Sequence, residues 1–138
     1  MWDIKTLKKE FKLNKLYQEL NKKYFNNILG ECTFKTAPDP NAIVPSVATI
    51  YTYIKRTGGI TATIKFNSRI DWNEEDIRRV LLHEMIHYYI FIKFKRHLIF
   101  SHGLPFIWKM LKINICYNEH IRMFWYKTKL TWSNNQPR

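Results

Sequence analysis

The chain has 138 residues, 46% of them hydrophobic and 16% aromatic, which suits a single folded domain with a buried core. No stretch approaches the roughly 18 uncharged apolar residues of a membrane-spanning helix, and we expect no secretory signal peptide at the N-terminus. Lysine and arginine (23) outnumber aspartate and glutamate (11), giving a net charge of +12. We therefore expect a cytoplasmic or nucleoid-associated protein with no membrane partner and with a surface that attracts polyanions such as nucleic acid.

The positive charge lies on both sides of one neutral stretch. Residues 71–100 contain five basic and five acidic side chains, so the whole excess belongs to the segments before and after them. Cysteine is scarce, with only Cys32 and Cys116 in the sequence. Two cysteines cannot form a four-cysteine zinc ribbon, and in a reducing compartment we expect both to be free thiols.

The first predicted elements are a helix and a β-rich section. Apolar residues recur at helical spacing from Ile4 to Phe25, which predicts an amphipathic helix that stops near Gly30. Alternating and β-branched residues then predict strands, and the turn at residues 56–59 joins the last two as an antiparallel hairpin. The expected strands are residues 32–36, 46–55 and 60–66.

The second half of the chain is predicted to be mainly helical. Asn73 is followed by three acidic residues and suits a helix start, and this helix should run to about Phe94. Pro105 suits the first turn of a short helix through Leu111. The last segments are less regular: residues 118–124 are compatible with a helix, residues 127–132 with a strand or an arm, and residues 133–138 with a flexible tail.

The most informative motif is His83-Glu84-Met85-Ile86-His87, inside the second predicted helix. Residues four apart on a helix lie one above the other, so both imidazoles face the same point and supply half of a tetrahedral zinc site. Glu84 can then act on a water molecule at an open coordination position, which is the chemistry of a metallopeptidase. The metzincin class is excluded, because Lys93 stands where its third histidine would be.

A catalytic zinc ion needs a third protein ligand. The candidates downstream are His97, His102 and Glu119, the last followed by His120. We prefer His102, because Gly103 after it lets the backbone approach a metal closely. His97, in a basic stretch, and Glu119 stay open as alternatives.

Two separate groups of residues resemble the SprT-like zinc metalloproteases, including the Spartan type. Leu81-Leu82-His83-Glu84-Met85-Ile86-His87 and, after a gap, His102-Gly103-Leu104-Pro105-Phe106 resemble the family pattern LLHEMIH followed by HGxxF. Upstream, Leu16-Tyr17, Asn21, Tyr24-Phe25-Asn26 and Leu29 resemble the first helix of the family. Two matches in the right order are much more specific than either alone.

The resemblance implies a zincin-like α+β domain, which we expect to span residues 1–132. It would contain an N-terminal helix, a small antiparallel or mixed sheet, the helix with the HExxH motif, and a short helix that follows the third-ligand loop. His83, His87 and His102 would bind one catalytic Zn2+, and Glu84 would be the general base and then the proton donor. Many relatives carry a C-terminal zinc ribbon, which the cysteines of this chain cannot supply.

The better-known eukaryotic members of the family cut proteins on DNA (DNA–protein crosslinks), and the charge of +12 agrees with such a partner. We therefore predict a monomeric zinc endopeptidase that acts on DNA-associated proteins, with DNA stimulation as a further hypothesis. Residues 124–129 and Trp132 interleave aromatic and basic side chains, which would either stack on unpaired bases or form a last strand. Two alternatives stay open: a basic nucleic-acid-binding module with a structural zinc, and a general zinc peptidase without a nucleic-acid partner.

Two hypotheses concern the substrate. By analogy to zincins, Ile60–Phe66 is a candidate edge strand that would pair with an extended peptide. A tyrosine hydroxyl would stabilise the oxyanion that forms when water attacks the peptide carbonyl. The candidates are Tyr53, Tyr88 and Tyr126, with none preferred.

Overall fold

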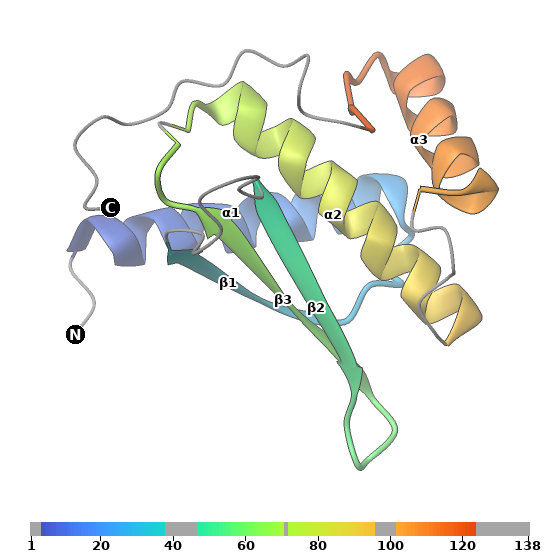
Figure 1. Cartoon of the computed structure of the whole chain (residues 1–138), viewed down its shortest axis with the longest axis horizontal. Coiled ribbons are helices and arrows are strands. Elements are labelled where there is room, and N and C mark those ends of the chain that lie inside the picture. The colour runs from blue at the N-terminus through green and yellow to red at the C-terminus, as the bar shows by residue number, and fades with distance from the viewer. Residues whose placement is uncertain (1–3, 38–46, 71, 96–101, 124–138) are drawn as a thin grey trace.

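A computed structural model describes residues 4–37, 47–70, 72–95 and 102–123, with the backbone alone for residues 4–11. The predicted α+β class is confirmed, since three helices accompany a small mixed sheet of three strands in these residues (Figure 1). In chain order the elements are α1 (Ile4–Tyr24), β1 (Glu31–Ala37), β2 (Ala48–Ile54), β3 (Ile60–Asn67), α2 (Glu74–Phe94) and α3 (Leu104–Tyr117). None of these helices is long and apolar enough to cross a membrane.

The sheet has β3 at its centre, parallel to β1 and antiparallel to β2. The predicted hairpin of β2 and β3 is confirmed. Its turn places Gly58 at a φ of 92°, a left-handed conformation that glycine adopts without steric cost. The hypothesis that Ile60–Phe66 is an edge strand is wrong, because β3 is hydrogen-bonded to a neighbour on each side. An edge of the described sheet is formed instead by β2.

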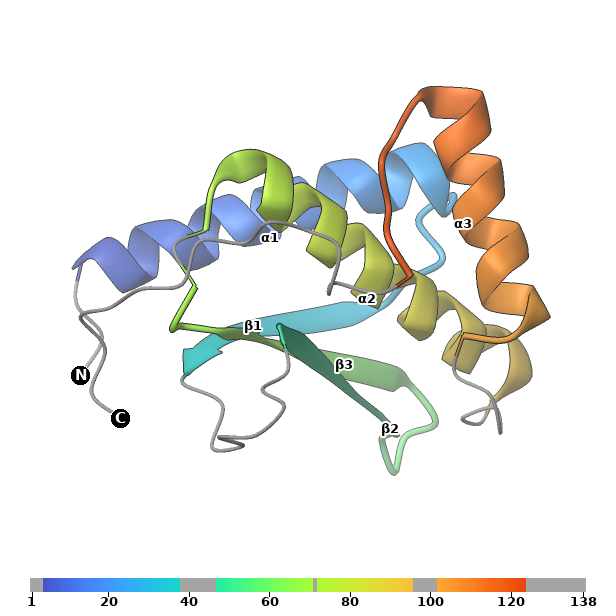
Figure 2. The ribbon, with the colours of Figure 1, turned by 45° about the horizontal axis from the view of Figure 1, so that its top comes forward.

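Helices α1 and α2 lie on the same face of the sheet (Figure 2). The strands alternate accordingly: Phe34, Ile64 and Ile50 lie in register across the sheet and contribute to the core. Lys35 and Tyr51, at positions of the opposite parity, are exposed. Because successive strand residues point to opposite faces, this alternation determines which face of the sheet meets the helices.

The core is built around α2. Six of its side chains are fully buried, which explains why the helix is apolar on more than one side. They are Val80, Leu81, Leu82, Met85, Ile86 and Tyr88. Full burial of each aliphatic side chain is worth roughly 1.5–3 kcal/mol, so this one helix supplies a large share of the apolar stabilisation.

The ends of α2 lie where the sequence predicts them. The side chain of Asn73 accepts a hydrogen bond of 2.8 Å from the backbone N–H of Asp76, and acidic residues fill the first turn. These acids complement the positive end of the helix dipole. At the other end, Lys95 adopts a left-handed conformation and its N–H donates to the carbonyl of Phe91 over 2.7 Å.

The end of α1 differs from the prediction. The helix stops at Tyr24, and Asn26 and Asn27 have positive φ angles of 51° and 58°, which asparagine tolerates better than most residues. Gly30 has a different role, at the entrance to β1. A Cβ atom there would lie 2.9 Å from the carbonyl oxygen of Ile60, so a side chain would collide with the neighbouring strand.

The C-terminal half of the described chain also departs from the prediction. Helix α3 runs to Tyr117, six residues beyond the predicted end at Leu111. It is closed by Asn118, which adopts a left-handed conformation. The prediction of a helix over residues 118–124 is wrong for residues 118–123, which have no regular secondary structure.

Several sequence predictions lie outside the described residues. They concern the start of the second strand at residue 46, His97, Tyr126, the aromatic and basic run at residues 124–129 with Trp132, the strand or arm at residues 127–132, and the tail at residues 133–138. The domain boundary at residue 132 stays a prediction as well.

Replacing Asn21 by alanine should lower the free energy of unfolding by about 2 kcal/mol or more, because two backbone groups of Leu29 would lose their partners in a buried place. Asn21 is 4% exposed; its amide donates to the Leu29 carbonyl (2.9 Å) and its Oδ1 accepts from the Leu29 N–H (3.2 Å). Urea unfolding measures the loss. The control Gln18→Ala, at an exposed position of the same helix, should change stability by less than about 0.5 kcal/mol. Equal stability of the two variants would contradict the role given to Asn21.

Candidate metal centre

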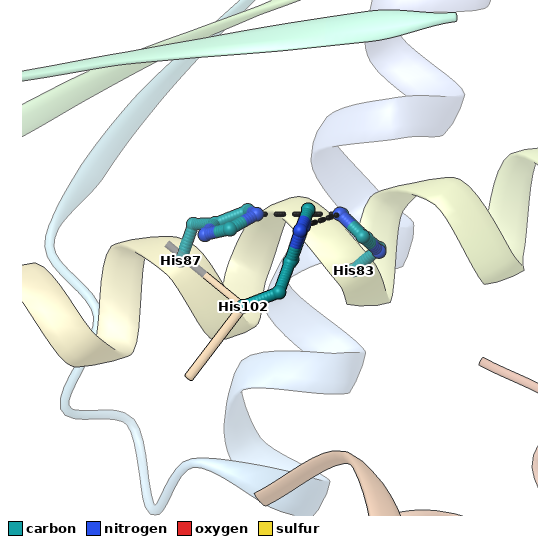
Figure 3. Close-up of side chains that lie close together, drawn as sticks. All are labelled: His83, His87 and His102. Atoms are coloured by element: carbon teal, nitrogen blue, oxygen red, sulfur yellow. Dashed lines mark hydrogen bonds between the residues drawn. The ribbon is translucent and has the colours of Figure 1, made fainter. Parts of the chain in front are cut away.

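The structure brings three histidines from two parts of the chain together (Figure 3). His83 and His87 lie one turn apart on α2, and His102 lies just before α3. The Nε2 atom of His83 is 3.2 Å from Nε2 of His87 and 3.2 Å from Nε2 of His102. One nitrogen from each ring lies within 4.8 Å of the others, so the three rings are close enough to bind a single ion.

Phe106 packs against all three imidazoles. Its ring centroid is 4.9 Å from that of His83, 4.7 Å from that of His87 and 4.9 Å from that of His102. Phe106 is fully buried in the first turn of α3 and anchors this helix in the core. A buried ring in contact with each imidazole restricts the rotation of all three.

A backbone carbonyl determines the tautomer of His83. The Nδ1 atom of the ring lies 2.6 Å from the carbonyl oxygen of Arg122, and because a carbonyl can only accept, Nδ1 carries the proton. The Nε2 atom that faces His87 and His102 is then the unprotonated nitrogen, whose lone pair can bind a metal ion. A hydrogen bond of this kind, from the second nitrogen of a ligand histidine to a carbonyl, is the usual support of a metal site.

Burial keeps His83 neutral. It lowers the pKa of the ring to about 4; His102 adds to the effect, and the contact with Arg122 opposes it. Burial also lowers the pKa of His102. Only a neutral imidazole can bind a metal ion, so both rings are in the binding form at neutral pH.

Glu84 lies between the two α2 histidines in the sequence and is 4% exposed. Burial raises the pKa of its carboxyl group to about 8. A group whose pKa lies near the working pH can both take up and return a proton.

This set of side chains fits a zinc ion. Imidazole nitrogens are among the preferred ligands of Zn2+, and structural zinc sites fill four positions with protein ligands whereas catalytic sites use three and leave one open. Within the residues that the structure describes, no cysteine, carboxylate or further histidine joins the three histidines. Among these residues the group therefore offers three imidazole ligands, the number that a catalytic zinc site takes from the protein.

The other third-ligand candidates lie elsewhere. The carboxylate of Glu119 accepts hydrogen bonds from Arg78 (Nη2, 2.6 Å; Nε, 2.9 Å) and from the hydroxyl of Tyr24, so the alternative that it is a metal ligand is wrong. His120 is exposed and does not belong to the histidine group. His97 is not among the described residues. His102, the ligand preferred from the sequence, is the residue that the structure places beside His83 and His87.

The tyrosines differ in what they can offer a substrate. Tyr88 is fully buried, and its hydroxyl points at the sheet, within hydrogen-bonding distance of the carbonyls of Glu31 (3.0 Å) and Ile60 (3.2 Å). It therefore ties α2 to β1 and β3 and is not available to an oxyanion. Tyr53 is half exposed on β2. No observation assigns it to the site.

The carbonyl of Arg122 is the part of the site that sequence reasoning missed. It is a backbone group that every residue possesses, so no residue type marks it. The sequence did indicate that Phe106 lies near the site, because Phe106 follows His102 by about one helical turn. Its contact with all three imidazoles required the tertiary structure.

The α+β fold and the three clustered histidines are compatible with a zincin-like fold. The sequence model of the SprT-like family matches residues 13–124, from α1 to just beyond the Arg122 carbonyl. The chain belongs to the SprT-like family. This family is generally associated with metallopeptidase activity and with zinc. No curated protein matches the chain.

Replacing His102 by alanine should weaken metal binding by at least about 100-fold, more than the loss of a supporting group around a metal typically costs. The measurement is competition of the purified protein with a chelator for Zn2+, or titration with Co2+ followed by its visible absorption. His120→Ala is the matched control, because His120 is exposed and outside the histidine group. An equal loss of metal affinity in both variants, or no loss in either, would contradict the assignment of His102.

Proposed function

We propose that the protein is a zinc-dependent endopeptidase in which His83, His87 and His102 hold one Zn2+ and Glu84 is the catalytic residue. The observation that carries the proposal is the group of three histidine nitrogens, together with Glu84, which follows His83 on α2, is buried and has a pKa raised toward neutrality. Membership of the SprT-like family supports the same activity. When bound, the ion would polarise a peptide carbonyl and lower the pKa of a water molecule.

The residues of the chain have separate tasks in this reaction. His83 keeps its Nδ1 proton on the Arg122 carbonyl and so presents Nε2. Phe106 holds the three imidazoles in place through the contacts described above. Glu84 takes the proton of the attacking water and returns it to the nitrogen of the leaving amine, and its burial keeps bulk water from competing for that proton.

The edge of β2 that faces away from β3 is the proposed place for the substrate backbone. β2 pairs with β3 on one side, has no strand on its other side within the described sheet, and packs beside α2 (Figure 1). An extended peptide can add to such an edge through main-chain hydrogen bonds. This corrects the sequence hypothesis, which assigned the same role to Ile60–Phe66.

Proteins bound to DNA are the proposed substrates. The net charge of +12 favours a polyanionic partner, and lysines gather where α2 ends beside α3. The pKa of Lys109 is lowered by burial and further by the positive charges of Lys112 and Lys93, so the three ammonium groups are close enough to influence one another. Lys93 and Lys112 are exposed and are suited to contact phosphate groups.

Glu84→Gln should retain the metal and the fold but abolish cleavage, because an amide cannot take up and return a proton. Zinc content, urea unfolding, and cleavage of casein or of the protein itself are compared with wild type, with and without single-stranded DNA. Unchanged cleavage in the variant would contradict the proposed enzyme. If neither protein cleaves while removal of zinc unfolds both, the site is that of a nucleic-acid-binding module with a structural zinc.

Replacing Lys93 and Lys112 together by glutamine should weaken DNA binding and lower the slope of log K against log salt by about 1–2, because each lost phosphate contact removes roughly 0.7–0.9 from that slope. Lys35→Gln with Lys65→Gln is the control, since this pair lies in register on the opposite face of the sheet. Fluorescence anisotropy with a labelled oligonucleotide measures the DNA affinity and its salt dependence for each double variant. Failure of the wild type to bind at moderate salt would instead favour a general zinc peptidase without a nucleic-acid partner.

A further inference from the structure

The segment that follows α3, residues 118–123, places the backbone carbonyl of Arg122 beside a histidine of the metal centre. Residues 118–123 have no regular secondary structure, yet they bring the Arg122 carbonyl to 2.6 Å from Nδ1 of His83. A helix or a strand would be kept in place by its own hydrogen-bond ladder. This segment needs side chains to hold it instead.

Asn114 provides the first of these attachments. Its amide donates to the carbonyl of Ile121 over 3.1 Å, and its Oδ1 accepts from the Ile121 N–H over 2.9 Å. The side chain of Ile121 is 4% exposed and belongs to the core. The residue just before Arg122 is thus fixed to α3 through its backbone and to the core through its side chain.

Glu119 provides the second attachment, through a cluster that we call the Glu119 brace: Tyr24, Arg78 and Glu119. The Arg78 guanidinium donates through two nitrogens to the Glu119 carboxylate, which also accepts from the Tyr24 hydroxyl. The Glu119 side chain is only 12% exposed. Paired charges in such a half-buried place interact more strongly than an exposed pair, and a two-pronged contact also defines the geometry.

The brace connects the segment to the helix that carries the metal ligands. Arg78 lies on α2 five residues before His83, and Tyr24 ends α1. The segment is therefore attached to α2 at two points, by Glu119 at Arg78 and by the Arg122 carbonyl at His83. A shift of either attachment changes the distance between that carbonyl and Nδ1.

We propose that Glu119 is a positioning residue of the metal centre: through Arg78 and Tyr24 it holds the Arg122 carbonyl against Nδ1 of His83 and so keeps His83 in the tautomer and orientation that bind a metal ion. The inference rests on the proposed metal site. Without the brace, the segment keeps only its attachment at Ile121, so the Arg122 carbonyl is held less tightly, the imidazole proton exchanges between Nδ1 and Nε2, and the ring rotates more freely.

The test uses Glu119→Ala and Glu119→Gln in the full chain. Both should bind Zn2+ or Co2+ about 10–100-fold more weakly than wild type, as expected for loss of a group that supports a metal ligand. The tautomer of His83 is read in the metal-free protein from the long-range proton–nitrogen NMR spectrum of the imidazoles. Wild type should show a protonated Nδ1 at His83, and the variants a mixture of tautomers.

A matched control separates positioning from general stability. Glu75→Gln breaks an ion pair with Arg79 on the same helix, at a glutamate whose side chain is 68% exposed, and should leave metal affinity and the His83 spectrum unchanged. Arg78→Lys keeps the positive charge but loses the two-pronged contact, so it should show a smaller effect in the same direction. Metal affinities are measured under conditions in which urea unfolding shows that each metal-free variant is folded.

Wild-type affinity and a single Nδ1-protonated His83 in the Glu119 variants would overturn the proposal. If Glu119→Ala does not fold, Glu119→Gln and Arg78→Lys decide by the same two measurements. If the wild type itself binds no metal, the proposed function fails, whereas the tautomer of His83 in the metal-free protein still tests the positioning role. The double variant Arg78→Ala, Glu119→Ala should lose no more affinity than either single change, because the two residues act as one unit.

Discussion

Burial of polar groups within α2 is the constraint on which the rest of the structure depends. His83 and Glu84 are 3% and 4% exposed, in a helix whose neighbouring side chains are fully buried. Taking such groups from water is costly unless they become neutral or find partners. Both effects operate here, since burial favours the neutral form of each group and the Arg122 carbonyl accepts the proton of His83. A bound cation would shift Glu84 back toward its charged form, so the site and the ion suit one another.

The elements around α2 contribute both to the core and to the candidate metal centre. The sheet orients α2 through the Tyr88 hydroxyl, which lies near two strand carbonyls, and Gly30 leaves room for that approach. On the other side, α3 supplies Phe106, and the segment after it supplies a carbonyl and a carboxylate. Residues 103–123 thus support the imidazoles, which explains why residues 118–123 are firmly attached although they have no regular secondary structure.

Local sequence signals predicted most of the fold. The capping of α2 by Asn73, the hairpin turn at Gly58 and the class of the domain all follow from short-range chemistry. Two of the failures, the strand order and the role of Glu119, share a cause, which is that longer-range contacts decided them. Nothing local shows that β1 pairs in parallel with β3 and makes β3 the central strand. Likewise, Glu119 was an open ligand candidate until its partners Arg78 and Tyr24, 41 and 95 residues away in sequence, were known.

The sequence by itself determined the residues on which the proposed chemistry rests and the family: the spacing of His83 and His87 on a helix, the glutamate between them, and the motifs shared with SprT-like proteins. These features are local, because a helix turns once in 3.6 residues whatever the rest of the chain does. Only the tertiary structure decided that His102 joins the pair, that Phe106 packs against all three rings, and that a carbonyl sets the tautomer of His83. Those contacts join residues brought together by the packing of α3 and its C-terminal extension on α2, and a backbone carbonyl leaves no trace in the order of the side chains.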